Sequence, residues 1–294
     1  MEKAVYHLPG LFEFYEFYRK FLPIYREKTE YFYDWCQIGS LYGAPADCLW
    51  AGGRVSTGNA DPRQVLALTE EYGLSARLTF SNSLLRPEHL KDPKCNRLCA
   101  LFGAEPGNGG IVHSELLLDY LKEKYPNFYF VSSTTKVLTD FEDLAAETER
   151  PDFRYVVPDF RLNKAFDRLA GLKEKRKVEF LCNECCWPGC RERKACYENV
   201  SRKNLGEHCP DHICAAPEGE KGYRFSAAMK NPAFIGIRDI RETYLPMGFS
   251  QFKIEGRGLG SAMLLEFILY YLTKPEYQLP LREEMYLDSM LDLF

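Results

Sequence analysis

After Gly43, short apolar runs alternate with amphipathic segments, and this alternation restricts the possible folds more than any other feature of the sequence. Each run has the length of a strand, and most are followed by a segment with helical periodicity. Strands that alternate with helices form parallel sheets, because each helix returns the chain to the edge where the next strand starts. The eight strand candidates are Asp47–Ala51, Ala76–Phe80, Gly110–Val112, Phe128–Val131, Arg154–Val157, Lys177–Leu181, Phe234–Ile237 and Phe252–Ile254.

The number and spacing of these units predict an α/β fold. Eight units over about 230 residues match the usual size of a closed (β/α)₈ barrel. We therefore predict a TIM-like barrel at residues 46–275. An open doubly wound sheet is the structural alternative, although no GxGxxG follows the first strand candidate. The helical candidates are Asp61–Tyr72, Ser114–Lys124, Asp140–Glu149, Leu162–Lys173, Asp239–Leu245 and Gly260–Leu272.

The two ends of the chain differ from the repeating part. Residues 1–45 are rich in Phe and Tyr at mixed helical spacing, with breaks at Pro9-Gly10 and Pro23. We predict an N-terminal helical extension packed on one end of the barrel; an aromatic ligand platform is the alternative. Residues 276–294 include LREEMYLDSMLDLF, which predicts an amphipathic C-terminal helix packed on the barrel.

Charge and hydropathy exclude several classes of protein. The N-terminus has no apolar run followed by a cleavage site, so we expect no signal peptide and a cytoplasmic protein. No window reaches the roughly 18 apolar residues that a membrane span requires. The formal net charge of −4 argues against broad binding to duplex DNA, which needs a strong positive field, but leaves a local RNA contact open.

Polar side chains follow nearly every strand candidate, so a barrel would gather them on one face. In TIM-like barrels the carboxyl ends of the strands line the active site. We predict catalytic roles for His113, Asp159 and Glu255, because imidazoles and carboxylates exchange protons. Helix caps and ion pairs are the structural alternatives for these residues. The predicted substrate-binding residues are Arg54, Asn82, Lys136, Asn163 and Arg257.

Seven of the eleven cysteines lie between Cys182 and Cys214, directly after the sixth strand candidate. Without a secretory signal, this density indicates a soft-metal site rather than a disulfide framework. Thiolates hold zinc or iron–sulfur clusters, usually through four ligands. The CxxxCxxC spacing of enzymes that cleave S-adenosylmethionine reductively is absent, because Arg193 occupies its third position. Paired CxxC knuckles, a strong sign of zinc, are absent too.

This segment therefore contains more candidate ligands than a four-ligand metal site needs. The preferred set is Cys186, Cys190, Cys209 and Cys214, and the substitutes are Cys182, Cys185, Cys196, His208 and His212. The other cysteines, Cys36, Cys48, Cys95 and Cys99, are interpreted as small buried apolar residues, with Cys95 and Cys99 as second-choice ligands.

The stretch YRFSAAMKNPAFIGIRDIRETYLPMGFSQFKIEGR resembles the C-terminal barrel signature of the collagenase-like U-type (group thirty-two) peptidase family. Lys253-Ile254-Glu255-Gly256-Arg257 matches the last strand of that pattern, and Gly52-Gly53-Arg54 fits its opening turn. The resemblance covers roughly residues 48 to 275. It implies an iron–sulfur TIM barrel in which Cys186, Cys190, Cys209 and Cys214 hold a [4Fe–4S] cluster, and Glu255 and Arg257 lie on the rim.

The resemblance also implies an activity. Several members of the family take part in oxygen-independent hydroxylation of RNA bases or of the ubiquinone ring. We therefore expect an iron–sulfur enzyme with a small-molecule or RNA-borne aromatic substrate and an electron-donor protein as partner. The chain departs from the family in its cysteine spacing. A hydrolase or peptidase with structural zinc and a metal-stapled scaffold are the alternatives; neither GxSxG nor HExxH is present.

Overall fold

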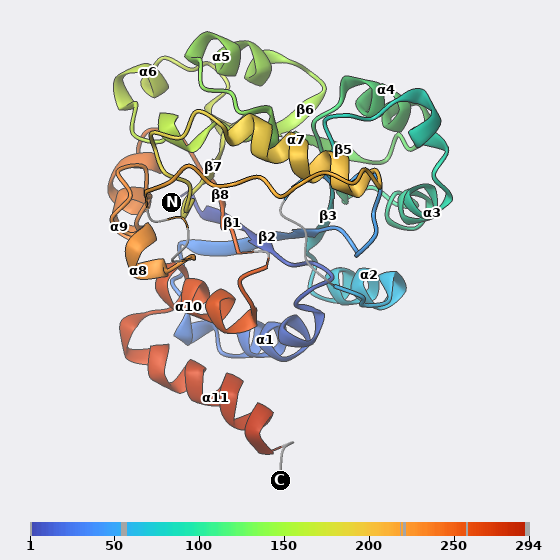
Figure 1. Ribbon diagram of the computed structural model, residues 1–294. Helices are drawn as coiled ribbons and strands as arrows, with labels where there is room; N and C mark the ends of the chain where they lie inside the picture. Colours follow the sequence, from blue (N-terminus) through green and yellow to red (C-terminus); the bar gives the residue numbers. More distant parts are fainter. Residues whose placement is uncertain (1, 54–57, 218, 220–221, 257, 292–294) are drawn as a thin grey trace.

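The computed structural model of the protein describes residues 2–53, 58–217, 219, 222–256 and 258–291. Eight parallel strands form the centre of the molecule and helices surround them (Figure 1). The strands neighbour one another in the order β6-β5-β4-β3-β2-β1-β8-β7, and a parallel bridge between Val156 and Val178 joins the two ends of the sheet. The predicted (β/α)₈ TIM-like barrel is confirmed.

The strands are β1 (Ala4–Pro9), β2 (Cys36–Gly43), β3 (Ser75–Phe80), β4 (Gly109–Val112), β5 (Tyr129–Ser132), β6 (Phe153–Val156), β7 (Glu179–Leu181) and β8 (Gln251–Lys253). The helices are α1 (Tyr15–Glu27), α2 (Pro62–Glu71), α3 (Pro93–Phe102), α4 (Glu115–Lys124), α5 (Phe141–Glu149), α6 (Phe166–Ala170), α7 (Arg193–Asn204), α8 (Phe225–Ala228), α9 (Ile237–Asp239), α10 (Ser261–Tyr271) and α11 (Gln278–Leu291). The 3₁₀ turns are η1 (Thr29–Tyr31), η2 (Pro87–Lys91), η3 (Thr134–Lys136), η4 (Phe160–Leu162), η5 (Lys175–Lys177) and η8 (Pro275–Tyr277). The π turn is η7 (Ile240–Tyr244).

Two of the eight strand assignments are wrong. Asp47–Ala51 forms turns, and Phe234–Ile237 lies outside the sheet. The missing strands are β1 and β2, which fall in the segment predicted to be a helical extension. Dense aromatic residues and two prolines concealed β1, and the glycines at both ends of the apolar run in β2 weaken its strand pattern.

The position of these strands changes the count along the barrel. The cysteine-rich excursion (182–214) follows β7, the seventh strand, and not the sixth as predicted. Within residues 2–45, α1 and the short turn η1 are helical, while β1 and β2 belong to the barrel itself. The predicted C-terminal helix is present as α11.

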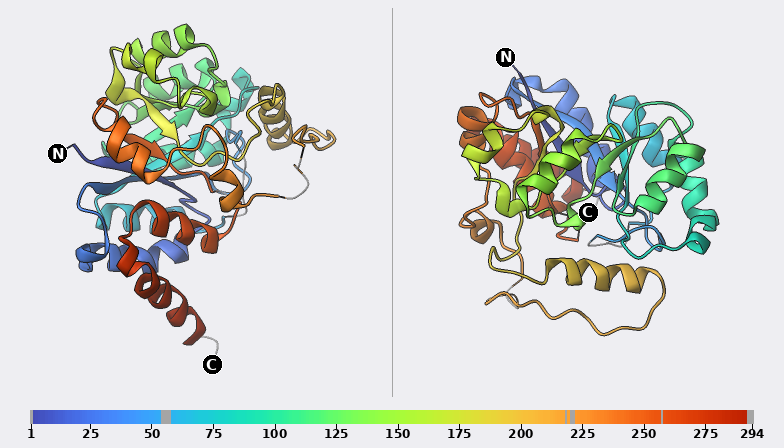
Figure 2. Two further views of the ribbon diagram at one scale, coloured as in Figure 1. Left: turned by 90° about the vertical axis from the view of Figure 1, so that its left-hand side faces the viewer. Right: turned by 90° about the horizontal axis from the view of Figure 1, so that it is seen from above.

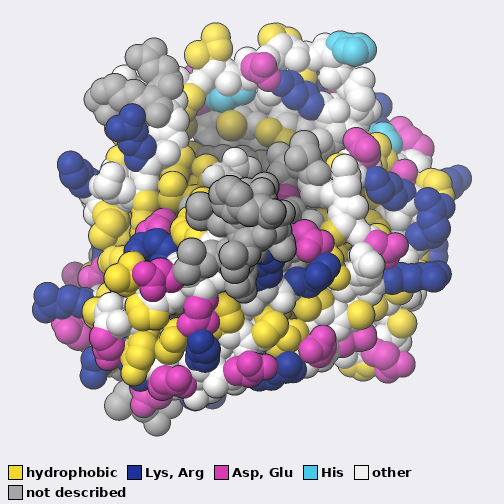
Figure 3. Space-filling model, turned by 90° about the horizontal axis from the view of Figure 1, so that it is seen from below, with side chains coloured by type: hydrophobic (Ala, Val, Ile, Leu, Met, Phe, Trp, Pro, Cys, Tyr) yellow, Lys and Arg dark blue, Asp and Glu magenta, His cyan; other side chains and the backbone are white. Residues whose placement is uncertain are grey.

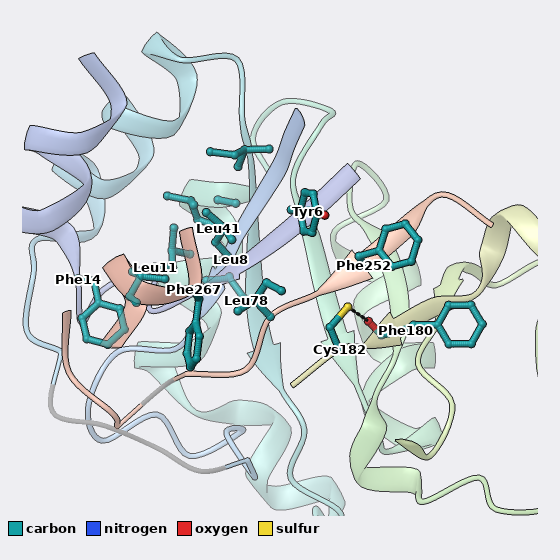
Figure 4. Close-up of a cluster of buried hydrophobic side chains, with 14 of the residues drawn as sticks. Tyr6, Leu8, Leu11, Phe14, Leu41, Leu78, Phe180, Cys182, Phe252 and Phe267 are labelled. Atoms are coloured by element: carbon teal, nitrogen blue, oxygen red, sulfur yellow. Dashed lines mark hydrogen bonds between the residues drawn. The ribbon is translucent and has the colours of Figure 1, made fainter. Parts of the chain in front are cut away.

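Alternate side chains of each strand face opposite sides of the sheet, and the two sides differ in polarity. Outward-facing residues such as Tyr6, Leu8 and Leu78 pack against helices in a large apolar core (Figure 4). Cys182 belongs to this core: it is 0% exposed, and its thiol donates to the carbonyl oxygen of Phe180 at 3.6 Å. The helices are therefore held to the barrel mainly by apolar burial.

The inside of the barrel is polar and charged at its middle. Arg77 Nη1 lies 2.5 Å from Glu179 Oε2, and both side chains are almost completely buried. Lys253 Nζ lies 3.6 Å from the other Glu179 oxygen, and His7 Nε2 lies 3.5 Å from Oε2. Tyr129 accepts a hydrogen bond from Arg77 Nε at 2.8 Å. One carboxylate thus lies among three basic side chains from β1, β3 and β8.

The charge states of this cluster follow from burial and from the charges themselves. Burial opposes ionisation of Glu179, but the Arg77 cation above all, with the Lys253 cation, outweighs it and lowers the pKa of Glu179 to about 2. Burial and the Arg77 cation lower the pKa of His7 to about 3. At neutral pH Glu179 is therefore a carboxylate and His7 is neutral, with Nδ1 of its ring 2.8 Å from Ser40 Oγ.

The excursion after β7 forms a separate layer over one end of the barrel (Figure 2). The chain after α7 runs back along that helix: Asn199 donates to the carbonyl oxygen of Pro210 at 2.8 Å, and His212 lies 3.6 Å from Glu192. On the face seen in Figure 3, acidic and basic side chains are interspersed. Among the described residues, no helix has the length and apolar character of a membrane span.

Replacing Glu179 by Gln should lower the free energy of unfolding by about 3–5 kcal/mol, because it leaves Arg77 buried without its counter-charge. Urea denaturation followed by circular dichroism measures this change. The matched control is Glu105→Gln, since Glu105 is exposed at the same end of the barrel. A loss below about 1 kcal/mol, the range of surface ion pairs, would contradict the role given to Glu179.

Candidate active site

A cavity opens at the carboxyl ends of the strands, which is where active sites of TIM-like barrels lie. Its empty space is about 520 Å³ when the open mouth is included, but only about 50 Å³ of it is enclosed space for water-sized groups. Its lining combines inward-facing strand residues with residues of the loops that follow the strands. These residues are Tyr42, Gly53, Thr79, Ser81, Ile111, Ser133, Thr134, Thr135, Leu181, Glu184, Tyr197, Lys253 and Glu255.

The inner end of the cavity is apolar and aromatic, with one ammonium group. Tyr42, Ile111 and Leu181 pack there in a small cluster. The hydroxyl of Tyr42 donates to the carbonyl oxygen of Ile254 at 2.6 Å, which fixes its ring. Lys253 Nζ lies 4.1 Å from the centre of that ring, a cation–π distance. The ammonium group of Lys253 therefore covers one face of the Tyr42 ring.

One wall of the cavity is a chain of hydroxyl groups that ends at a histidine. The Thr135 hydroxyl donates to Ser133 Oγ at 2.9 Å, and Ser133 donates to Ser81 Oγ at 3.1 Å. Thr135 Oγ1 also lies 2.8 Å from His113 Nδ1, so this nitrogen carries the proton when Thr135 donates onward. The chain gives a continuous path for proton exchange between His113 and the cavity wall.

His113 is half-buried at the end of β4, and burial is the largest influence on its charge. Burial and the nearby Lys136 and Lys194 cations lower the pKa of His113 to about 4. At neutral pH its imidazole is therefore uncharged. A neutral imidazole accepts a proton at one nitrogen and donates one at the other, as general acid–base chemistry requires.

A buried ion-pair network attaches the cysteine-rich loop to this cavity. The Glu184 carboxylate lines the cavity and accepts hydrogen bonds from the backbone N–H groups of Cys185 at 2.9 Å and Cys186 at 3.0 Å. Its other oxygen accepts from Arg193 Nη2 at 2.6 Å. Arg193, 2% exposed, also lies 3.6 Å from Asp159. The position of the loop relative to the cavity is therefore fixed by charge-assisted hydrogen bonds.

The four predicted metal ligands are not gathered in one place. Cys186 and Cys190 lie in the loop before α7, and Cys214 is exposed. Cys209 Sγ accepts from the side-chain amide of Asn199 at 3.5 Å. Asn199 is about 10 Å along α7 from its start, at ~1.5 Å per residue. The structure therefore places Cys209 apart from Cys190, and the ligand set stays a prediction.

These positions bear on the zinc alternative. Tetrahedral zinc with thiolate bonds of about 2.3 Å brings its sulfur atoms to about 3.8 Å from one another. Among the described residues, the ligand atoms that come within 4.8 Å of one another in a group of three belong to Glu184, Cys185 and Glu255. Because the Glu184 carboxylate already binds two backbone N–H groups and Arg193, it serves as a cap for the loop. A preformed cysteine-rich zinc site is thus absent from the described part.

Several predicted functional residues are held in ion pairs, helix caps or buried hydrogen bonds, and their functional roles stay predictions. Asp159 caps η4 and forms a two-point ion pair with Arg161, with distances of 2.6 and 3.0 Å. Lys136 lies 2.6 Å from Glu147, in the helical layer. Asn82 and Asn163 are fully buried, and both donate side-chain hydrogen bonds to backbone carbonyl oxygens. Arg54 and Arg257 lie outside the described residues.

Glu255 lines the cavity, and His113 contacts it through Thr135. The sequence reasoning missed other residues of the cavity. Tyr42 was missed because β2 was not recognised as a strand. Lys253 was quoted within its motif, yet strand alternation places it inside the barrel two residues before Glu255, on the cavity wall. Period-two counting from the end of β8 was the signal that could have found it.

Comparison with known proteins supports the fold. The solved structure of the U32 peptidase Mk0906 is similar to this chain, with a TM-score of 0.53 and 15% sequence identity. The match covers 86% of this chain and 92% of that one. Family models and curated protein sequences give no match. At 15% identity the likeness shows a U32 peptidase-like barrel fold and does not establish an activity.

His113 should titrate with a pKa of about 4 in the folded protein, which NMR of its ring signals measures directly. Lys194→Met should raise this pKa, because removing a nearby positive charge makes the imidazolium easier to form. Lys124→Met, a change on the exposed side of α4, is the control and should leave the titration unchanged. A pKa near the ordinary value of about 6.5 in the unchanged protein would contradict the burial of this ring.

Proposed function

We propose that this protein is an iron–sulfur-dependent enzyme that hydroxylates an aromatic ring or nucleobase without molecular oxygen, or carries out a related redox step on it. One observation carries the proposal: the loop that bears Cys185 and Cys186 is joined through the Glu184 carboxylate to the wall of the cavity. A redox group held by this loop would lie beside a bound substrate.

The donor set fits such a group in its chemistry. Cys186 and Cys190 are half-buried and Cys214 is exposed, so their thiols are accessible, whereas Cys182 is enclosed in the apolar core. We propose Cys186, Cys190, Cys209 and Cys214 as the ligands, with Cys209 as the member that the fold holds apart. When bound, a [4Fe–4S] cluster would supply or accept single electrons, and an electron-donor protein would be the partner.

The residues of the cavity have separate roles in this proposal. Tyr42 and Ile111 offer a flat apolar surface for an aromatic ring. Lys253 offers a positive charge to an electron-rich oxygen on that ring. His113 holds or releases a proton through Thr135, Ser133 and Ser81. Glu255 lines the cavity and would exchange a proton with a polar substituent of the substrate. The substrate is either a small molecule or carried by RNA.

The competing proposal is a hydrolase or peptidase with a structural zinc, which the likeness to a U32 peptidase fold keeps in view. Zinc and a [4Fe–4S] cluster both need four converging thiolates, so metal analysis rather than the cysteine positions distinguishes the two proposals. We also propose a cytoplasmic location. The described residues form no disulfide, as expected in a reducing compartment.

Anaerobic purification followed by iron and sulfide analysis tests the cluster. We expect a brown protein with about four irons per chain. Cys190→Ala should lose most of this iron, because the cluster loses a ligand. Cys182→Ala, which changes a thiol enclosed in the core, is the matched control and should keep it. Stoichiometric zinc without iron would refute the iron–sulfur proposal. Full iron content in both variants would refute the ligand set.

Glu255→Gln should reduce formation of the hydroxylated product by about 10²-fold or more, since a positioned carboxylate contributes by this order to a proton-coupled step. The measurement is mass spectrometry of nucleosides, quinones and small aromatic compounds from cells that lack the gene and carry a variant copy. Glu242→Gln, an exposed change near α9, serves as control. If the Glu255→Gln copy restores the full amount of hydroxylated product, Glu255 has only a structural role.

A further inference from the structure

Two cysteines outside the excursion face each other inside the protein. Cys48 lies in the turns after β2, and Cys95 lies in the first turn of α3. Their sulfur atoms are 3.6 Å apart, and the residues are 3% and 0% exposed. We propose that Cys48 and Cys95 are an oxidation site, a thiol pair that closes reversibly to a disulfide. This inference does not rest on the proposed function.

The surrounding backbone holds both cysteines in place. The N–H of Cys95 donates to the Asp92 carboxylate at 2.7 Å, which caps α3. The carbonyl oxygen of Cys48 accepts from the N–H of Ala51 at 3.0 Å, which closes its turn. A disulfide bond is about 2.05 Å long, so the sulfur atoms need to approach by about 1.5 Å. Rotation of two side chains supplies a movement of this size without a change of fold.

The two thiols differ in reactivity. The hydrogen bond from Cys95 lowers the pKa of Cys48, although burial opposes this shift. Thiolates are the nucleophiles in cysteine chemistry, so Cys48 attacks the oxidant first. Cys99 lies one turn beyond Cys95 in α3, and burial raises the pKa of its thiol. The hydrogen bond to Cys48 and burial also raise the pKa of the Cys95 thiol, so the distance decides: Cys95 resolves the reaction because its sulfur lies 3.6 Å from that of Cys48.

The oxidant is a small peroxide, because buried sulfur atoms exclude bulky disulfides such as oxidised glutathione. The Cys48 thiolate takes one oxygen atom from hydrogen peroxide and becomes a sulfenic acid. The hydroxide that leaves the peroxide takes a proton from solvent and becomes the first water. Cys95 sulfur then attacks Cys48 sulfur, the S–O bond breaks, and a second water leaves. Two thiols lose two electrons and two protons, and hydrogen peroxide is reduced to two waters.

The position of the pair links it to the candidate active site. The side-chain amide of Asn82 donates to the carbonyl oxygen of Leu49 at 3.1 Å, and that of Asn204, at the end of α7, donates to the carbonyl oxygen of Ala51 at 2.5 Å. Gly53, two residues further, lines the cavity. A disulfide would therefore tie the segment after β2, which also contacts the end of α7, to α3, next to the cavity.

The test uses the full-length protein, reduced and then exposed to hydrogen peroxide, alkylated in denaturant and digested with trypsin and Asp-N. This digestion places Cys48 alone in residues 47–54 (DCLWAGGR) and Cys95 alone in residues 95–97 (CNR). We expect these two peptides to be joined as the main form of both, and dithiothreitol to release them. If peroxide oxidises excursion cysteines while Cys48 and Cys95 are recovered alkylated, or if Cys48 is joined to Cys99, the proposal is overturned.

Two variants separate this pair from its neighbour. Cys95→Ala should abolish the cross-link and leave Cys48 as an over-oxidised acid, whereas Cys99→Ala should keep the cross-link. Thermal unfolding before oxidation checks that both variants fold like the unchanged protein. A cross-link of Cys48 to any cysteine in Cys95→Ala at the unchanged yield would refute the pairing. The peptide map of the unchanged protein tests the disulfide without either variant, so the proposal can still be refuted if a variant does not fold.

Discussion

The contact between Arg77 and Glu179 is the constraint on which the arrangement of this barrel depends. A buried guanidinium requires a buried carboxylate, and the two come from β3 and β7, on opposite sides of the ring of strands. Glu179 also holds Lys253, which projects into the cavity at the carboxyl end. The charge at the centre of the barrel therefore determines both how the strands close and where the cavity has its positive group.

A second set of charges organises the rim. Arg193 of α7 contacts Glu184 after β7 and lies near Asp159 after β6, while the Glu184 carboxylate fixes the backbone of the cysteine loop. The excursion is thus part of the wall of the cavity rather than a detached staple. The hydroxyl chain from Ser81 to His113 lies close to this network, because Thr134 beside it accepts a hydrogen bond from Arg193 at 3.3 Å.

Sequence reasoning succeeded where local pattern and burial agree. Apolar runs flanked by turns predicted β3 to β8, and strand-to-helix transitions brought His113 and Glu255 to one face. It failed for β2, whose glycines and Ser40 belong to a strand only because neighbours on both sides pair with it. The sequence could not show that the side chains of Asn82 and Asn163 bond backbone carbonyl oxygens of distant segments. Lys253 and Tyr42 were missed because successive side chains of a barrel strand point alternately inward and outward. Which of them point inward can be assigned only once the bounds of the strand are known.

The ring of strands has a seam. Neighbouring strands pair over three to six residues elsewhere, but β6 and β7 are joined through the bridge of Val156 with Val178. Beyond that bridge, Arg193 spans from Asp159 to Glu184, and Arg161 reaches the carbonyl oxygen of Cys190. The cysteine-rich excursion therefore serves as a clamp across the weakest join of the barrel. Any event that rearranges its thiols would also alter how firmly the cylinder is closed.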